Sequence, residues 1–208
     1  MTRLIPTRNG RRGNAMLEFA LCMSFLTPLL LGTFNIGMNL GRNLQVTQLS
    51  RNVGHMYVRW VDFSQTGSQD LAIRLAVGLN MARTSGDGIV VLSQVTVPSD
   101  ADCTANNLTG AACVNRNVPV IIHRIVFGNA TLPGSAFGTP AIALVQPDGT
   151  ISPANYLTDT SVRATNWSSV MTLAAGEVAY VSEVYVRSPS WDLPGQYANS
   201  GVYARTIY

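Results

Sequence analysis

The sequence predicts an α+β protein, in which a long N-terminal transmembrane helix packs at its outer half on an antiparallel β-sheet domain with a second short helix. Twenty-three consecutive residues without a charge separate Glu18 from Arg42. Apolar residues then recur at helical spacing among polar ones, which predicts that the helix continues as an amphipathic one. After residue 88, segments rich in β-branched residues alternate with turn residues, as in a sheet. The 208 residues are enough for one globular domain and one appendage.

The distribution of charge separates a short leader from the rest of the chain. All fourteen basic residues are arginines, and four of them precede Asn14, whereas all eleven acidic residues follow it. From Asn14 onward, ten basic residues stand against eleven acidic ones, so the net charge of +3 belongs to the leader. This pattern indicates a cytoplasmic N-terminus and an outward C-terminal domain, and it argues against a nucleic-acid partner.

The uncharged segment is long enough to cross a membrane. As a helix, residues 19–41 (FALCMSFLTPLLLGTFNIGMNLG) span about 34 Å, against about 30 Å for a hydrocarbon core. Pro28 is tolerated in a membrane helix as a kink. A cleaved secretory signal would have a shorter apolar core and an A-x-A-like site, and a glutamate is unfavourable after the Arg11-Arg12 pair of a twin-arginine signal. A plain signal anchor stays open as an alternative.

Glu18 is the residue that a plain anchor leaves unexplained. A carboxylate near the centre of a membrane helix costs about 2.5–3.5 kcal/mol, and a smaller amount near the interface. Such a group needs a partner. The alternative is an interfacial acid whose side chain reaches the lipid headgroups.

The helix is expected to continue over residues 42–62 along an apolar stripe, with Tyr57 and Trp60 in the core (Leu40, Leu44, Leu49, Val53, Met56, Tyr57, Trp60). Ser68 is a candidate cap for a second helix over about residues 69–83, with apolar residues on its faces (Leu71, Leu75, Leu79, Met81).

Four segments are predicted as strands: residues 89–97, 118–128, 176–186 and 201–208. A hairpin turn is predicted at Pro147-Asp148-Gly149. Four charged residues in or next to the last two segments are expected at exposed strand positions (Glu177, Glu183, Arg187, Arg205).

Two cysteines suit a disulfide. Cys103 and Cys113 lie ten residues apart in a polar loop, where a cross-link stabilises by roughly 2–3 kcal/mol and requires an oxidising compartment. Two unpaired thiols are the alternative. Cys22 lies inside the apolar run and is expected to behave as a small hydrophobic residue.

The sequence predicts no enzyme and no cofactor. His55 and His123 lie on different elements without a second ligand at metal-binding spacing, and no nucleotide-binding or hydrolase motif is present. No small-molecule substrate is expected. The loops 98–118 and 187–200 are the expected contact surfaces, and Trp191 in the second is either an exposed anchor or a cover over the core.

The first fifty residues resemble TadE/TadG-like pseudopilins, the minor pilin-like proteins of the tight adherence (Tad, Flp) pilus, which are related to type IV pilins. Members show a basic leader ending in Arg-Gly, then Glu-Phe-Ala-Leu, a proline-interrupted leucine run and an outer Phe-Gly. The corresponding residues here are Arg12-Gly13, Glu18 to Leu21, Pro28 to Gly32, and Phe34. Asn35-Ile36 separates Phe34 from Gly37, which departs from the commoner adjacent pair. The match covers a quarter of the chain.

The resemblance implies that prepilin peptidase removes residues 1–13 by cutting between Gly13 and Asn14 on the cytoplasmic side. Glu18 then becomes the fifth residue of the mature chain, about 6 Å along the helix from the new α-amino group. In related pilins this carboxylate pairs with the N-terminal ammonium of a neighbouring subunit, so Glu18 and Phe19 are implied to act in assembly.

The implied organisation is a leader, an assembly helix over residues 14–41, its amphipathic continuation, and a periplasmic or extracellular α+β domain over residues 63–208. The spacing of Gly37 and Gly41 (G-x-x-x-G) is typical of close helix–helix contact. The expected partners are prepilin peptidase, other pilins and pseudopilins, the pilus assembly platform and inner-membrane lipid.

The expected function is that of a minor pseudopilin in the bacterial inner membrane, which initiates, caps or regulates a Tad-type pilus and contributes to adhesion. It could also enter the extracellular fibre. Two alternatives stay open: a membrane-tethered periplasmic binding or scaffolding domain without a pilus role, and an adhesin displayed at a pilus tip.

Overall fold

The computed structural model describes residues 12–187 and 201–208, with side chains from residue 15 onward. Its main elements are two helices and four strands, with two shorter helices between strands: α1 (Arg12–Val58), α2 (Thr66–Leu75), β1 (Gly88–Thr96), α3 (Asp100–Ala105), β2 (Val120–Gly128), α4 (Pro153–Thr158), β3 (Val178–Arg187) and β4 (Gly201–Ile207). The chain divides into two units, of which one ends at Gly41 and the other begins at Arg42. The α+β class with a long apolar N-terminal helix is confirmed.

The four strands form one antiparallel sheet in the order β2-β1-β3-β4. In the centre, Val91 of β1 lies opposite Val126 of β2 and Glu183 of β3. A register shift between Gln94 and Val95 interrupts the β1–β2 ladder. The extra residue is Ile122 of β2, so the bulge changes which side chains of β2 face each side of the sheet.

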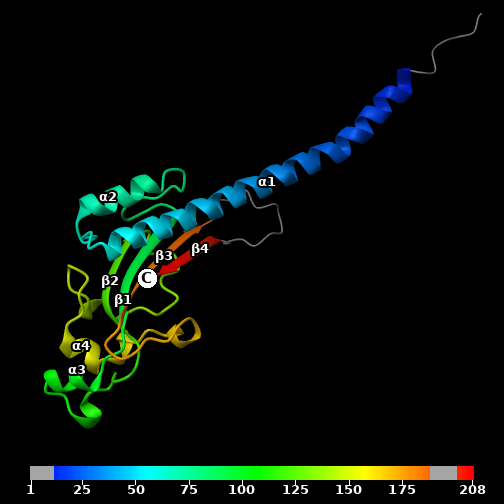
Figure 1. Cartoon of the computed structure of the whole chain (residues 1–208). Helices are drawn as coiled ribbons and strands as arrows, with labels where there is room; N and C mark the ends of the chain where they lie inside the picture. The colour runs from blue at the N-terminus through cyan, green and yellow to red at the C-terminus, as the bar shows by residue number, and fades with distance from the viewer. Residues whose placement is uncertain (1–11, 188–200) are drawn as a thin grey trace, which may run out of the picture. The chain divides into compact units, whose positions relative to one another are not determined.

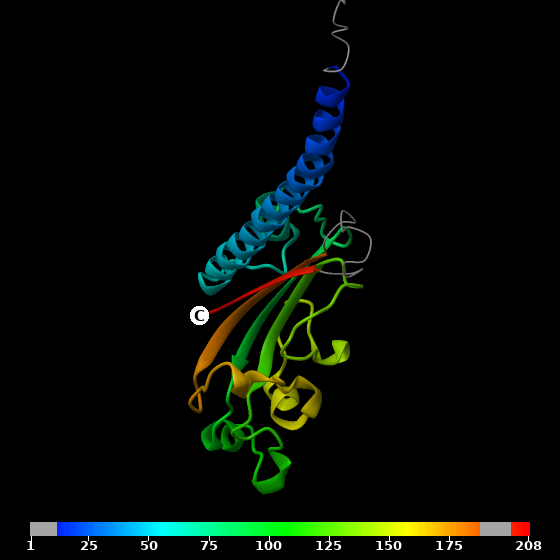
Figure 2. The same ribbon diagram turned by 90° about the vertical axis from the view of Figure 1, so that its right-hand side faces the viewer.

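Both faces of the sheet are covered. The part of α1 from Arg42 onward lies with α2 on one face, and the long segment between β2 and β3 lies on the other (Figure 1, Figure 2). On the first face, α1 contributes four fully packed side chains at helical spacing (Val46, Leu49, Val53, Tyr57). The core of the second face is built around large side chains of the covering segment (Phe137, Ile151, Val162, Trp167). Each of these side chains contributes about 1.5–3 kcal/mol through burial.

α1 ends at Val58, four residues before the predicted end. The N–H of Val61 donates to the carbonyl oxygen of Met56 and the N–H of Trp60 to that of Tyr57, each at 3.1 Å, so the helix closes with a Schellman motif. The prediction that Trp60 lies in the core is wrong, because its side chain is 78% exposed. Tyr57, on the inner face of the helix, is buried as predicted.

The second helix is shorter than predicted and begins earlier. α2 starts after Gln65, so Ser68 lies inside the helix and is not its cap. The helix ends at Leu75 because the chain turns at Gly78 and Asn80, both with positive φ angles. Of the predicted apolar positions, Leu79 is buried while Leu71 and Leu75 are about half exposed (49% and 47%).

The predicted strands agree with β1, β2, β3 and β4 to within two residues at each described end. The predicted hairpin turn is present: the N–H of Gly149 donates to the carbonyl oxygen of Gln146 at 2.8 Å. The two arms of this hairpin pair only through an isolated bridge between Val145 and Ile151, so they do not form extended strands. The prediction that Glu183 is exposed is wrong, since its side chain is 1% exposed.

The loop after β1 is an ordered structure around the disulfide. α3 begins with a capping box, in which Ser99 accepts from the N–H of Asp102 and the Asp102 carboxylate accepts from the N–H of Ser99. Cys103 and Cys113 form a disulfide and are both buried. The predicted disulfide is therefore present, and the alternative of two free thiols is wrong.

Candidate functional site

The described part of the first unit is an apolar helix surface without a cover. From Met16 to Leu40, fourteen large hydrophobic side chains are exposed, with Met16 80% and Phe25 75% exposed. Among the described residues, α1 is the one helix long and apolar enough to cross a membrane. An uncovered surface of this kind is unfavourable in water, so this helix needs lipid or another apolar surface around it.

Glu18 is an acidic group within this surface. Its side chain is exposed, and no hydrogen bond or ion pair of it is found within the described part of the chain. Phe19, the other predicted assembly residue, is 63% exposed. Gly13 and Asn14, which flank the predicted cleavage site, lie in the first turn of α1.

Several polar side chains of the apolar segment form hydrogen bonds within the helix itself. The hydroxyls of Ser24 and Thr33 donate to the carbonyl oxygens of Leu21 and Leu30, at 2.7 and 2.9 Å. The Asn39 amide donates to the side-chain oxygen of Asn35 at 2.8 Å. These bonds lower the cost of placing the polar groups in lipid, whereas Glu18 has no such internal bond.

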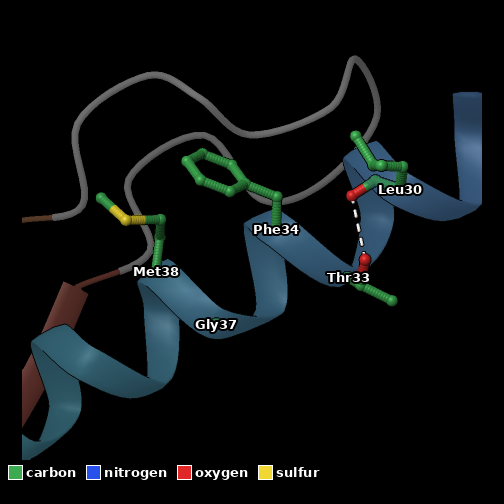
Figure 3. A pocket seen from close by; sticks show the side chains of 5 residues that line it. All are labelled: Leu30, Thr33, Phe34, Gly37 and Met38. Atoms are coloured by element: carbon green, nitrogen blue, oxygen red, sulfur yellow. Dashed lines mark hydrogen bonds between the residues drawn. The ribbon is translucent and has the colours of Figure 1, made fainter.

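A shallow hollow lies along the middle of this segment, and the described residues that line it all belong to α1 (Leu30, Thr33, Phe34, Gly37, Met38). Figure 3 shows the side chains of Leu30, Phe34 and Met38 on one side of the helix, as their spacing of four residues requires. The described residues that line it are mostly apolar, and none of them is titratable. It fits an apolar neighbour better than a polar ligand.

The two glycines of the predicted helix contact are open. A methyl group added at Gly37 or Gly41 would meet no atom within 4 Å. By contrast, a methyl group at Gly54, where α1 crosses the sheet, would lie 2.6 Å from the ring of Tyr208. Gly54 therefore allows a close contact between α1 and Tyr208 within the chain, while Gly37 and Gly41 leave room for a neighbouring helix.

A buried polar cluster beneath the segment between β2 and β3 was not predicted from the sequence. The Glu183 carboxylate accepts hydrogen bonds from the Ser135 hydroxyl, the Ala136 N–H at 2.9 Å and the Tyr203 hydroxyl at 2.5 Å. Burial lowers the pKa of Arg124 to about 10, while the negative charge of Glu183 opposes the shift. These hydrogen bonds hold residues 135–136 against β3 and β4. The alternation of apolar and polar residues along the strands did not indicate the cluster, because Arg124 and Glu183 occupy inward positions, where apolar residues are expected.

Tyr57 and His123 form a second pair that the sequence did not predict. The Tyr57 hydroxyl lies 2.7 Å from Nδ1 of His123, between α1 and β2. Burial raises the pKa of Tyr57 and lowers that of His123. Both groups are therefore neutral at pH 7, and the pair links the helix to the sheet.

In the described part of the chain, no group of three or more histidine, cysteine, aspartate or glutamate side chains could hold a metal ion. The comparisons of the chain with family models, curated proteins and solved structures found no match.

Proposed function

We propose that the chain is a minor pseudopilin of a Tad-type pilus: a precursor that prepilin peptidase cuts between Gly13 and Asn14, and whose mature helix assembles with other pilins or pseudopilins in the inner membrane. One observation carries the proposal: the uncovered apolar surface of α1 contains a carboxylate, Glu18, without a partner among the described residues.

Cleavage would supply the missing partner. The cut creates a free ammonium at Asn14, about 6 Å along the helix axis from Glu18. In the assembled pilus, Glu18 would pair with the ammonium of a neighbouring subunit, since two opposite charges in lipid stabilise each other strongly when they meet. The uncleaved leader withholds this ammonium and keeps the precursor apart in the membrane.

The outer part of α1 supports the same proposal. Its residues from Val46 to Tyr57 pack against the sheet, so the folded unit is held by the helix that would carry it in an assembly. We propose that this is a pilin-like spine, with the domain on the outer side of the inner membrane.

The direct test is the N-terminal sequence of the membrane-associated protein from cells with and without prepilin peptidase. A mature chain that begins NAMLEFAL only when the peptidase is present supports the proposal. If residues 1–13 are retained in both strains, the leader is a topogenic anchor and the chain is a membrane-tethered domain without a pilus role.

Assembly is tested separately by Glu18→Leu. The variant should insert and be cleaved normally but should not be recovered with the sheared pilus or cross-linked to other pilins. Ser24→Ala, another exposed position of the same helix, is the control for a general change of the helix surface. Normal assembly of Glu18→Leu would contradict the proposed role of the carboxylate.

A further inference from the structure

Trp60 combines backbone strain with a high exposure. Its φ angle is 64°, in the left-handed region, at the position of the Schellman motif where glycine is usually found. A bulky residue in this region is a conformational outlier, because its Cβ approaches the neighbouring carbonyl oxygen. The side chain is nonetheless 78% exposed, so core packing does not account for it.

The other residues with positive φ show how unusual this choice is. In the described part of the chain they are either glycine or asparagine, the two residue types that adopt this conformation at the lowest cost. Trp60 is the one large side chain among them. A strained, exposed aromatic residue is the kind of feature that marks a contact surface.

The surroundings of Trp60 hold the indole and add negative charge. Tyr180 contacts it edge-on, with ring centroids 6.2 Å apart, which leaves much of the indole open to solvent. Two residues further along, the exposed Asp62 carboxylate accepts from the N–H of Ser64 at 2.8 Å. A hydrogen bond from the Ser64 side chain and this backbone bond both lower the pKa of Asp62, so the carboxylate stays ionised at neutral pH.

Asp62 and Asp148 are both exposed, and both act electrostatically on His123. Burial lowers the pKa of His123, so the imidazole adds no positive charge at pH 7. Arg59, which precedes Trp60 in the sequence, is also exposed.

We propose that Trp60, together with Asp62, binds an arginine side chain of a partner protein, with the guanidinium stacked on the indole and paired with the carboxylate. Indole is the aromatic group that attracts a cation most strongly, and the planar guanidinium combines stacking with an ion pair. A guanidinium also lies over an aromatic ring inside this chain, where Arg205 is 4.8 Å from the centroid of the Phe137 ring. This inference does not depend on the membrane role of α1.

The test uses the full chain in detergent micelles and a short peptide with one arginine as the probe. The control peptide carries citrulline, which has the same shape without the charge. The NMR signal of the Trp60 indole N–H, assigned by its loss in Trp60→Gly, should shift saturably with the arginine peptide and not with the citrulline peptide. Asp62→Asn should weaken the binding about 2- to 5-fold, as the loss of an exposed ion pair.

Trp60→Gly should also abolish the shifts of neighbouring signals while its thermal unfolding midpoint stays equal to that of the wild type or rises, because glycine relieves the strain. Trp60→Asn, which also tolerates a positive φ, should behave in the same way. Equal responses to the two peptides, binding that survives Trp60→Gly, or a response to a neutral oligosaccharide in place of the arginine peptide would overturn the proposal. A large loss of stability in both variants would also overturn it, since the indole would then be a packing residue.

Discussion

Replacement of Glu183 by alanine removes the acceptor of three hydrogen bonds at one buried point of the sheet. A hydrogen bond to a charged group contributes roughly 1.5–3 kcal/mol when it is buried. The three donors lie on partly exposed residues (Ser135, Ala136, Tyr203), so water can replace part of what they lose. The buried Arg124 guanidinium would keep its charge without the opposing charge of Glu183, which adds to the cost.

We therefore expect Glu183→Ala to lower the free energy of unfolding by about 3 kcal/mol, close to the lower limit for breaking a buried ionic contact. For a unit of this size, that corresponds to a fall of roughly 6–12 °C in the melting temperature. The measurement is thermal unfolding of the full chain in micelles, followed by near-ultraviolet circular dichroism.

Two control variants locate the effect. Tyr203→Phe removes one of the three hydrogen bonds and should cost about 1 kcal/mol, or roughly 2–4 °C. Glu177→Ala removes an exposed carboxylate just before β3, which accepts one hydrogen bond from the N–H of Ala174 at 2.8 Å, and should change the free energy of unfolding by about 0.5 kcal/mol. A melting temperature of Glu183→Ala as close to the wild type as that of Glu177→Ala would refute the reasoning.

Three further predictions concern the folded unit. The double variant Cys103→Ser, Cys113→Ser should lose about 2–3 kcal/mol, and reductant should lower the wild-type melting temperature to a similar extent; no change in either would contradict it. Burial lowers the pKa of His123, so the unfolded chain binds more protons than the folded chain as the pH falls below 6.5. The free energy of unfolding should therefore decrease between pH 7 and the lowered pKa. His123→Gln should remove this slope when unfolding is measured against pH. An equal slope in the variant would contradict the assignment. Gly54→Ala should destabilise by about 1–3 kcal/mol in denaturant titration despite the better helix propensity of alanine, because the added methyl group meets the Tyr208 ring; a stabilised variant would contradict the close contact.

The strands were predictable from the sequence because their signals are local. β-branched runs bounded by turn residues fixed the existence and approximate bounds of β1 and β2, and the turn before Gly149 followed from Pro147 and Asp148. The order β2-β1-β3-β4 has no local signal, since β1 pairs with a strand that begins some eighty residues later. Such pairing depends on which faces the helices cover.

The errors at Trp60 and Glu183 have a common physical origin. Sequence reasoning placed an aromatic residue inside and a carboxylate outside, which is the average behaviour of these residue types. The structure reverses both, because the helix closes with a turn that directs the indole outward and because three donors surround the carboxylate. Exceptions of this kind depend on tertiary contacts that no window of sequence contains.

The candidate assembly segment is where sequence reasoning went furthest. Its length, apolar character and single carboxylate are all properties of the sequence, and the structure adds that none of its large side chains is covered from Met16 to Leu40. Among the residues that the structure describes, Glu18 has no partner. The pairing of Glu18 with a new N-terminus is therefore a proposal from the resemblance: the processing experiment tests the cleavage, and Glu18→Leu tests the pairing.

The division at Gly41 separates the part of α1 that packs in the folded unit from the part that we propose for assembly. From Val46 onward α1 contributes buried side chains to the core, so substitutions on that inner face should unfold the domain. Before Gly41 the large side chains touch no core, and the glycines at 37 and 41 leave open space. Changes in that segment should leave the unfolding of the domain unaltered while they alter insertion, processing or assembly. A defect of Glu18→Leu in assembly can therefore be read as an effect on subunit contacts, because the folded unit does not depend on this part of the helix.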